Sequence, residues 1–228
     1  MRVVVKICCI ADVDEARLAV AHGAAALGLV SAMPSGPGVI TDASIAEVAA
    51  AIPAPTDTFL LTALTGAVAI AEQHARLNTT TLQLVDHVPH AELRELRRLR
   101  PGVRLVQVIH VTGEASVAEA VAVAPFVDAL LLDSGNPNLA VKELGGTGRV
   151  HDWSLSRRIR DVVHPLPLFL AGGLRPDNVG AAIAAVQPYG LDLCSGVRSD
   201  GRLDAAKLAA FMDAVQRTLR SQRPGAMR

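Results

Sequence analysis

Short apolar runs alternate with longer amphipathic segments eight times along this chain of 228 residues. The apolar runs are continuous rather than alternately polar, which is typical of parallel strands buried on both faces. Each run is followed by a segment of helical periodicity, and a strict strand–helix order requires parallel pairing with right-handed crossovers. Eight such units predict a single-domain α/β fold, the (β/α)8 TIM barrel.

The boundaries follow from where apolar periodicity starts and stops. The expected strands are Val3–Cys8, Ala26–Val30, Thr58–Leu64, Thr81–Leu84, Arg104–Ile109, Val127–Asp133, Leu166–Ala171 and Leu191–Ser195. The expected helices are Asp12–His22, Asp42–Ala51, Ala67–Leu77, Ala91–Leu99, Ser116–Val123, Ser154–Val162, Asp177–Val186 and Ala205–Leu219. We expect the barrel to span 1–221 and residues 222–228 to form a flexible tail. An open doubly wound sheet is the alternative, but the first unit lacks a G-x-G-x-x-G turn.

Composition excludes several classes of partner. The formal net charge is zero and the pI is about 7.1, so the basic footprint of a nucleic-acid-binding protein is absent. No signal peptide opens the chain, and no apolar stretch is long enough to cross a membrane. The three cysteines are an odd number and do not suggest a disulfide framework. We therefore expect a cytoplasmic protein, a monomer or homodimer, that binds a small molecule.

Two reactive side chains end two of the predicted strands. Cys8 ends the first strand and Asp133 ends the sixth. The carboxyl-end rim of such a barrel is where its enzymes carry out their chemistry. A candidate base and a candidate acid at one rim predict proton-transfer chemistry, although Cys8 could equally be a small core residue. Side-chain alternation along the strand predicts that Lys6 points the same way as Cys8 and that Cys9 points outward into the helix layer.

Glycines follow the seventh and eighth strands. Gly172 and Gly173 come after the seventh, and Ser195 and Gly196 after the eighth. Glycine lets the backbone approach an anion closely, and free amides at a helix start can donate to it. Loops at these two places are the recurrent phosphate site of barrel enzymes, so the pattern predicts a phosphorylated ligand.

The predicted loop from Ser134 to Asp152 is unusually long for a compact domain. It contains the run Gly145-Gly146-Thr147-Gly148. A long loop without its own secondary structure is often functional, and glycines permit hinge motion. We expect this loop to close over the substrate as a lid, with a disordered insertion as the alternative.

With these residues in place, the chain resembles the phosphoribosylanthranilate isomerase family over Val5 to about Lys207. The matching segments are Val5–Cys8, Gly23-Ala24, Ala26–Val30, Gln83-Leu84, Leu131–Ser134, Gly145–Gly148, His151–Ser154, Ala171–Leu174, Pro176–Val179 and Ser195–Val197. The resemblance implies an Amadori rearrangement of N-(5-phosphoribosyl)anthranilate without cofactor or metal. It implies that Asp133 is the general acid and Cys8 the general base. The phosphate would bind at Gly172, Gly173, Ser195 and Gly196, and further substrate contacts would come from Lys6, Gln83, Gly146, Arg149 and Arg198.

The sequence departs from this family where the aromatic acid should bind. The family's second loop typically reads Ser-Pro-Arg-Tyr-Val, and its arginine recognises the anthranilate carboxylate. Here the stretch is Ser35-Gly36-Pro37-Gly38-Val39, and Cys9 stands where the family normally has glycine. Arg149, Arg175 or Arg198 could supply the missing charge from another loop.

Three hypotheses remain open from the sequence: the parent isomerase, an isomerase or lyase of another ribose-phosphate compound, and a non-enzymatic phosphosugar sensor. A histidine-pathway isomerase is disfavoured, because no second half-barrel copy of the Val3–Cys8 unit carries a matching carboxylate.

Overall fold

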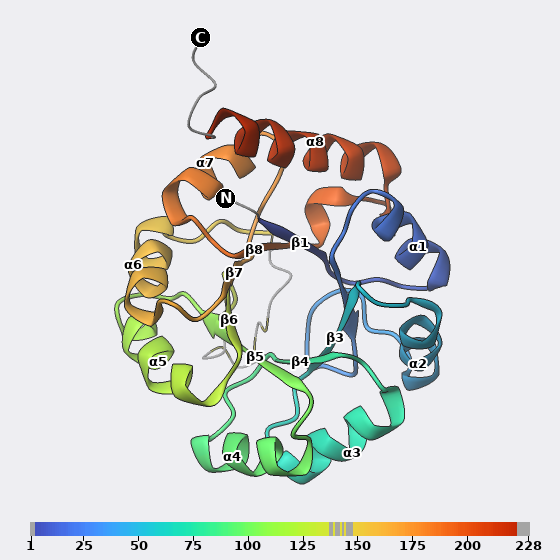
Figure 1. Cartoon of the computed structure of the whole chain (residues 1–228), viewed down its shortest axis with the longest axis vertical. Helices are drawn as coiled ribbons and strands as arrows, with labels where there is room; N and C mark the ends of the chain where they lie inside the picture. The colour runs from blue at the N-terminus through green and yellow to red at the C-terminus, as the bar shows by residue number, and fades with distance from the viewer. Residues whose placement is uncertain (1–2, 137–138, 140–141, 143, 145–147, 223–228) are drawn as a thin grey trace.

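Eight parallel strands close into a barrel in sequence order, and β1 pairs with β8 to complete it (Figure 1). The structure is a computed structural model that describes residues 3–136, 139, 142, 144 and 148–222. The strands are β1 Val4–Ile7, β2 Ala26–Val30, β3 Asp57–Thr62, β4 Thr81–Leu84, β5 Arg104–His110, β6 Ala129–Asp133, β7 Leu168–Leu170 and β8 Gly190–Leu193. The helices are α1 Val13–Ala21, α2 Asp42–Ala51, α3 Ala67–Leu77, α4 His90–Leu99, α5 Ala115–Val123, α6 Trp153–Val163, α7 Val179–Val186 and α8 Ala205–Ser221. The helices form a ring outside the strands, which confirms the predicted (β/α)8 barrel.

All sixteen predicted elements are present, and their ends differ from the expected ends by at most two residues. The sequence analysis missed a small hairpin, in which β9 Arg198–Ser199 pairs antiparallel with β10 Arg202–Leu203. It also missed the 3-10 turns η1 Ala124–Phe126 and η2 Ser195–Val197. Elements of two or three residues are too short to show a period. Residues 223–228 of the expected tail lie outside the described residues.

Side-chain caps fix where several helices begin. The Asp12 carboxylate accepts a hydrogen bond from Glu15 N at 2.8 Å, which starts α1. Thr41 caps α2 through Ser44 N, and Asp204 caps α8 through two backbone amides. An N-cap oxygen satisfies an amide that has no partner within the helix, and this contributes about 1 kcal/mol. These caps fix the residue at which each of these loops ends and its helix begins.

Two layers of apolar side chains surround the strands. The outer layer, between strands and helices, is built mainly from Leu, Ile, Val and Ala. The inner layer fills the barrel and includes Phe59 and Phe169, whose rings meet edge to face with centroids 5.8 Å apart. Because both faces of each strand are covered, the continuous apolar runs in the sequence are accounted for.

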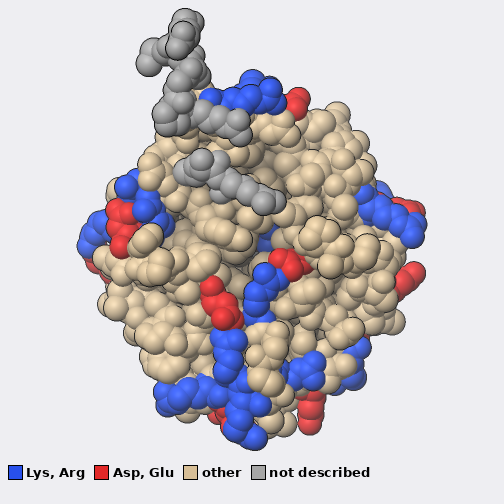
Figure 2. Space-filling model, in the orientation of Figure 1, with Lys and Arg blue, Asp and Glu red and all other residues tan. Residues whose placement is uncertain are grey.

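Charged side chains in the view of Figure 2 form mixed groups of both signs rather than one large patch, and most of the face is uncharged. Among the described residues, none of the helices has the length and hydropathy that crossing a bilayer requires.

Candidate active site

A cavity that is open to solvent lies at the carboxyl ends of the strands. Cys8, directly after β1, and Asp133, the last residue of β6, both line it. Gly172, Gly173, Ser195 and Gly196 line it as well, together with Gln83 and Asp192. The fold therefore brings together the predicted acid–base pair and the glycine loops that lie far apart in the sequence.

The ammonium group of Lys6 lies next to the thiol of Cys8 inside the barrel. Lys6 is fully buried, and its Nζ atom bonds to Asp192 Oδ1 at 2.8 Å. Burial alone would lower the pKa of Lys6, but the charges of Asp192 and of Cys8 outweigh it and raise that pKa. The prediction that Lys6 and Cys8 point the same way is confirmed, because both approach Gly28 of β2. A buried cation therefore lies close to the Cys8 sulfur.

Gly28 provides the space that these two side chains occupy. A Cβ atom at this position would lie 2.7 Å from Cys8 Sγ and 2.9 Å from Lys6 Nζ. Real Cβ atoms do not approach other heavy atoms this closely, so any larger residue would displace the thiol or the ammonium. The glycine in the middle of a strand is explained by this packing.

The surroundings of Asp133 raise the pKa of its carboxyl. Burial raises the pKa of the Asp133 carboxyl, and the backbone amide of Ser134, which donates to Oδ1 at 2.7 Å, only partly opposes this. His110, the register partner of Asp133 on the adjacent strand β5, also acts to lower this pKa, whereas the charge of Asp192 raises it further. A buried carboxyl with a raised pKa can donate a proton near neutral pH.

The glycine loops form a close-packed rim. Gly172 and Gly173 have φ values of 87° and 60°, which glycine adopts without strain. A Cβ on Gly172 would lie 2.9 Å from Arg149 O, and a Cβ on Gly196 would overlap Leu174 O. The loop after β6 thus lies directly against the loop after β7. The glycines allow the backbone to come close to its neighbours at the predicted phosphate site.

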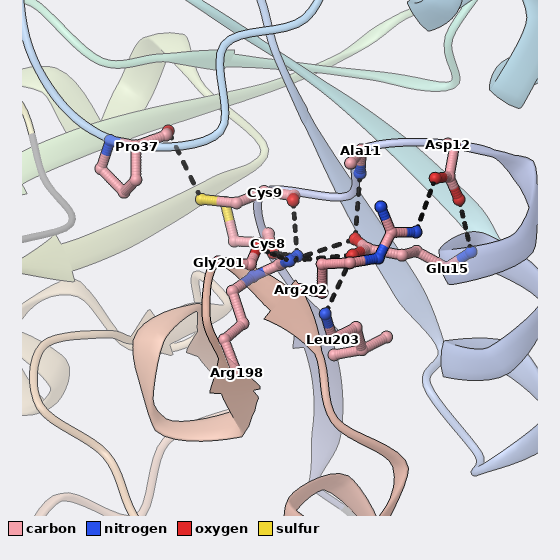
Figure 3. Close-up of polar contacts among 10 residues, drawn as sticks. All are labelled: Cys8, Cys9, Ala11, Asp12, Glu15, Pro37, Arg198, Gly201, Arg202 and Leu203. Atoms are coloured by element: carbon pink, nitrogen blue, oxygen red, sulfur yellow. Dashed lines mark hydrogen bonds and ion pairs between the residues drawn. The ribbon is translucent and has the colours of Figure 1, made fainter.

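Cys9 does not point into the helix layer, so that prediction was wrong. Its φ of 60° turns the chain in the left-handed sense at the end of β1, and the strand alternation stops there. Cys9 lines the cavity, and its thiol bonds to Pro37 O at 3.6 Å (Figure 3). Its side chain also meets those of Cys8 and Cys194.

Arg198 lies beneath the cavity rather than in its lining. Its guanidinium pairs with Glu15 at 3.1 Å and donates to the carbonyl oxygens of Cys8 and Cys9 (Figure 3). Both side chains of the pair are buried, at 9% and 4% exposure. With these partners, Arg198 supports the backbone that carries Cys8.

The remaining predicted substrate residues are placed differently from one another. Gln83 of β4 lines the cavity, and its buried Oε1 atom has no hydrogen-bond partner among the residues that the structure describes. Arg149 contacts the glycine loop through its backbone. Gly146 lies outside the described residues, as do 137–138, 140–141, 143, 145 and 147 of the same loop, so the lid stays a prediction.

Two polar residues of the site were missed from the sequence. Asp192 sits between two leucines in β8, and His110 ends β5 beside Asp133. A charge inside an apolar strand was the available signal for Asp192, since such a side chain needs a buried partner. Within the described part of the chain, no group of three or more His, Cys, Asp or Glu residues could hold a metal ion.

The fold and cavity together define a (β/α)8 barrel protein with a thiol, a carboxyl group and two glycine loops at the carboxyl end of its strands. The model of the N-(5'phosphoribosyl)anthranilate (PRA) isomerase family matches residues 5–214, and the chain belongs to this family.

Its relatives match over nearly their whole length. N-(5'-phosphoribosyl)anthranilate isomerase 2 of Methanosarcina mazei is 35% identical over 213 residues, covering 91% of this chain and 92% of its own. The isomerase of Methanothrix thermoacetophila is 35% identical over 218 residues, covering 93% and 97%. The crystal structure of phosphoribosyl anthranilate isomerase from Thermotoga maritima has a TM-score of 0.79 at 26% identity, covering 94% of this chain and 99% of that one.

Proposed function

We propose that this protein is an N-(5'-phosphoribosyl)anthranilate isomerase of tryptophan biosynthesis. It would convert its substrate by an Amadori rearrangement into 1-(2-carboxyphenylamino)-1-deoxyribulose 5-phosphate. The observation that carries the proposal is that Cys8 and Asp133 line the same cavity as the two glycine loops. Family membership and near-complete coverage by curated isomerases support the same conclusion.

In the proposed mechanism Asp133 starts the reaction. Its neutral carboxyl donates a proton to the ribose ring oxygen, and the ring opens to a protonated Schiff base. The raised pKa of Asp133 supports this role, because an acid must hold its proton at the working pH. The Ser134 amide, which bonds to Oδ1 at 2.7 Å, would orient the carboxyl.

Cys8 would act in the second step. Its thiolate removes the proton from C2 and leaves an enolamine. Tautomerisation then places a proton on C1 and takes one from the C2 hydroxyl, which resets both groups. Lys6 supports the thiolate as a fully buried cation, and Asp192 at 2.8 Å keeps that cation in place.

The 5-phosphate would bind at the glycine loops of the same rim. The backbone amides around Gly172, Gly173, Ser195 and Gly196 are the proposed donors, since bare amides at tight turns bind anions well. Anchoring the substrate by its phosphate holds the reacting carbons in place between the acid and the base. Gln83 lines the cavity, and its Oε1 is unpaired within the described part of the chain, so it is a proposed partner for a sugar hydroxyl.

The anthranilate carboxylate needs a cation that the second loop does not supply. We assign this role to Lys142. Its ammonium pairs with Asp86, which follows β4, and its carbonyl accepts a hydrogen bond from Ser35, which lines the cavity. Lys142 therefore joins the second, fourth and sixth loops at one side of the cavity. Arg198 is a weaker candidate because its guanidinium is buried against Glu15, whereas the Lys142 side chain is 46% exposed.

We further infer that the protein works in the cytoplasm as a monomer or homodimer, and without nucleic-acid or membrane partners. Three cysteines without a disulfide suit a reducing compartment. One solved relative, from Thermotoga maritima, is described as a dimeric enzyme from which monomers were generated.

Complementation of a tryptophan auxotroph that lacks this isomerase tests the function. We expect growth with the wild-type chain and none with Cys8→Ser or Asp133→Asn. The variant Asp14→Asn is the matched control, because Asp14 is almost fully exposed. Purified wild-type protein without turnover of phosphoribosylanthranilate would refute the proposal. Turnover of an analogue that lacks the carboxylate, but not of the parent, would favour a divergent isomerase of another ribose phosphate.

A further inference from the structure

Cys9 occupies a backbone conformation that suits glycine. Its φ of 60° lies in the left-handed region, which costs a residue with a Cβ atom roughly 1–2 kcal/mol. Cys9 is nevertheless buried, and it is neither a turn residue on the surface nor a helix cap. Strain of this kind persists where the side chain has a use.

The second loop makes room for this side chain. A Cβ atom on Gly38 would overlap Cys9 Cβ, so Gly38 is the counterpart of the cysteine at position 9. The Cys9 sulfur lies 3.6 Å from Pro37 O in the same loop. Figure 3 shows the thiol directed toward this loop, away from Arg198 and Glu15.

The thiol of Cys9 also meets a second thiol, that of Cys194. The two side chains interact with each other, and both residues line the open cavity. Cys194 is only partly buried, so a small solute in the cavity can reach it. The two positions are far apart in the sequence, and they meet because β1 and β8 are neighbours in the closed barrel.

The two sulfur atoms have different electrostatic surroundings. The neighbouring Cys9 thiol, followed by the charge of Arg198, lowers the pKa of Cys194 despite its burial. The contacts with Cys194 and Cys8 and the burial of the thiol raise the pKa of Cys9. A thiolate beside a cation is the nucleophile in thiol oxidation, and a neighbouring neutral thiol can resolve the product.

We propose that Cys9 and Cys194 form an oxidisable thiol pair, which a hydroperoxide converts into a disulfide, and that this modification site is separate from the base Cys8. In the first step the Cys194 thiolate attacks one peroxide oxygen. The O–O bond breaks, Cys194 becomes a sulfenic acid, and the second oxygen leaves as water or alcohol after taking a proton. In the second step the Cys9 sulfur attacks the sulfenic sulfur, and the hydroxyl leaves as water with the Cys9 proton. Two electrons pass from the two thiols to the peroxide.

The disulfide would affect both the proposed base and the proposed phosphate loop of the active site. Cys9 directly follows Cys8, and Cys194 directly precedes the proposed phosphate ligand Ser195. Bonding their sulfur atoms would pull the base and the phosphate loop from their working positions. A dithiol reductant would restore the protein, as expected of a transient disulfide in a reducing compartment. This consequence for turnover rests on the proposed function, whereas the bond itself does not.

The test is treatment of the folded, full-length protein with hydrogen peroxide, followed by alkylation and peptide mass analysis. We expect a cross-link between tryptic peptide 7–17 and the peptide that contains Cys194. The cross-link should form in wild type and in Cys8→Ser, and it should be lost in Cys9→Gly and in Cys194→Ser. Turnover of the wild type should fall about tenfold or more and recover with dithiothreitol.

Three other outcomes are possible, and each has a definite meaning for the thiol pair or for the proposed function. A cross-link that survives Cys9→Gly would show that Cys8 is the partner and would overturn the assignment. Free thiols at both Cys9 and Cys194 in oxidised wild type would overturn the pair altogether. A cross-link in a protein that never turns over phosphoribosylanthranilate would confirm the modification site while refuting the proposed function, so the two failures are distinguishable.

Discussion

The Nζ atom of Lys6 lies 2.8 Å from Oδ1 of Asp192, and Lys6 has no exposed surface at all. The two residues belong to β1 and β8, which meet where the barrel closes. The ion pair therefore links the first and last strands of the barrel. It also holds the Lys6 ammonium in place next to Cys8. The neighbouring ring of Phe59, 5.3 Å from the ammonium, adds a cation–π contact.

Breaking this pair should destabilise the fold. Asp192→Asn leaves a buried cation without its counter-charge, and we expect a loss of about 3–5 kcal/mol in the free energy of unfolding. The double variant Lys6→Met/Asp192→Leu should recover much of that loss, because no charge is left unpaired. Urea unfolding of the three proteins gives the comparison. A single variant as stable as wild type would contradict this account.

The same pair has a predictable response to pH. The pKa of Lys6 in the folded state is raised above its unfolded value. Its contribution to stability is therefore complete below the unfolded pKa of about 10.4 and declines only as pH rises further. The stability difference between wild type and the double variant should be constant from pH 6 to 9.

Gly28→Ala should impair catalysis through steric contact alone. The added Cβ would lie 2.7 Å from Cys8 Sγ and 2.9 Å from Lys6 Nζ, so one of them must move. We expect overpacking to cost about 1–3 kcal/mol of stability and kcat to fall at least tenfold. Gly102→Ala is the control, because nothing lies within 4 Å of a Cβ there. Unchanged kcat in Gly28→Ala would show that the thiol position is not critical.

Most of the architecture was predictable from the sequence, because it depends on local periodicity. Eight continuous apolar runs allow few arrangements once right-handed crossovers are required. The placement of Cys8 and Asp133 at one rim followed from the same rule, since each ends a strand of a parallel barrel. Their common cavity confirms that both residues reach the same space.

The parts that were not predictable depend on contacts between distant residues or on single backbone angles. Alternation predicted an outward Cys9, but one left-handed residue reversed its direction. The partner of Lys6 was left open, because pairing across the β1–β8 seam cannot be derived from spacing. The orientation of Arg198 was likewise set by Glu15, a residue of α1 that no local pattern connects to β9.

Replacing Arg198 tests whether it supports the backbone or binds substrate. Arg198→Met removes the bonds to Glu15 and to the carbonyl of Cys8, so we expect lower stability and a lower kcat with little change in KM. The expected loss is about 3 kcal/mol, the lower end for breaking a buried pair, because Glu15 keeps two backbone donors.

Arg202→Met is the matched control for this variant. Its guanidinium pairs with Asp12 at 3.1 Å but is 71% exposed, and exposed pairs contribute at most about 1 kcal/mol. Steady-state kinetics and urea unfolding of both variants distinguish the roles. A raised KM at unchanged stability in Arg198→Met would instead identify Arg198 as a direct substrate ligand.

Asp133→Asn should separate activity from stability. Burial raises the pKa of the Asp133 carboxyl, so the folded protein holds this proton more tightly than the unfolded chain. The resulting penalty is absent below the unfolded pKa of about 3.9 and grows as pH rises toward the folded value. Asparagine does not titrate and can still accept the bond from Ser134 N, so the variant should be more stable than wild type at pH 7 but not at pH 3.5.

Thermal unfolding at several pH values measures this difference, and a gain of 1 kcal/mol would raise the melting temperature by about 2–4 °C. Turnover by Asp133→Asn should be lost across the whole range, because the amide cannot protonate the ring oxygen. The exposed Asp14→Asn change should leave both quantities unaltered. A wild type that is more stable than Asp133→Asn at pH 7 would mean that the carboxylate is favourably solvated or paired in the folded state, and the assignment of Asp133 as a neutral acid would fail with it.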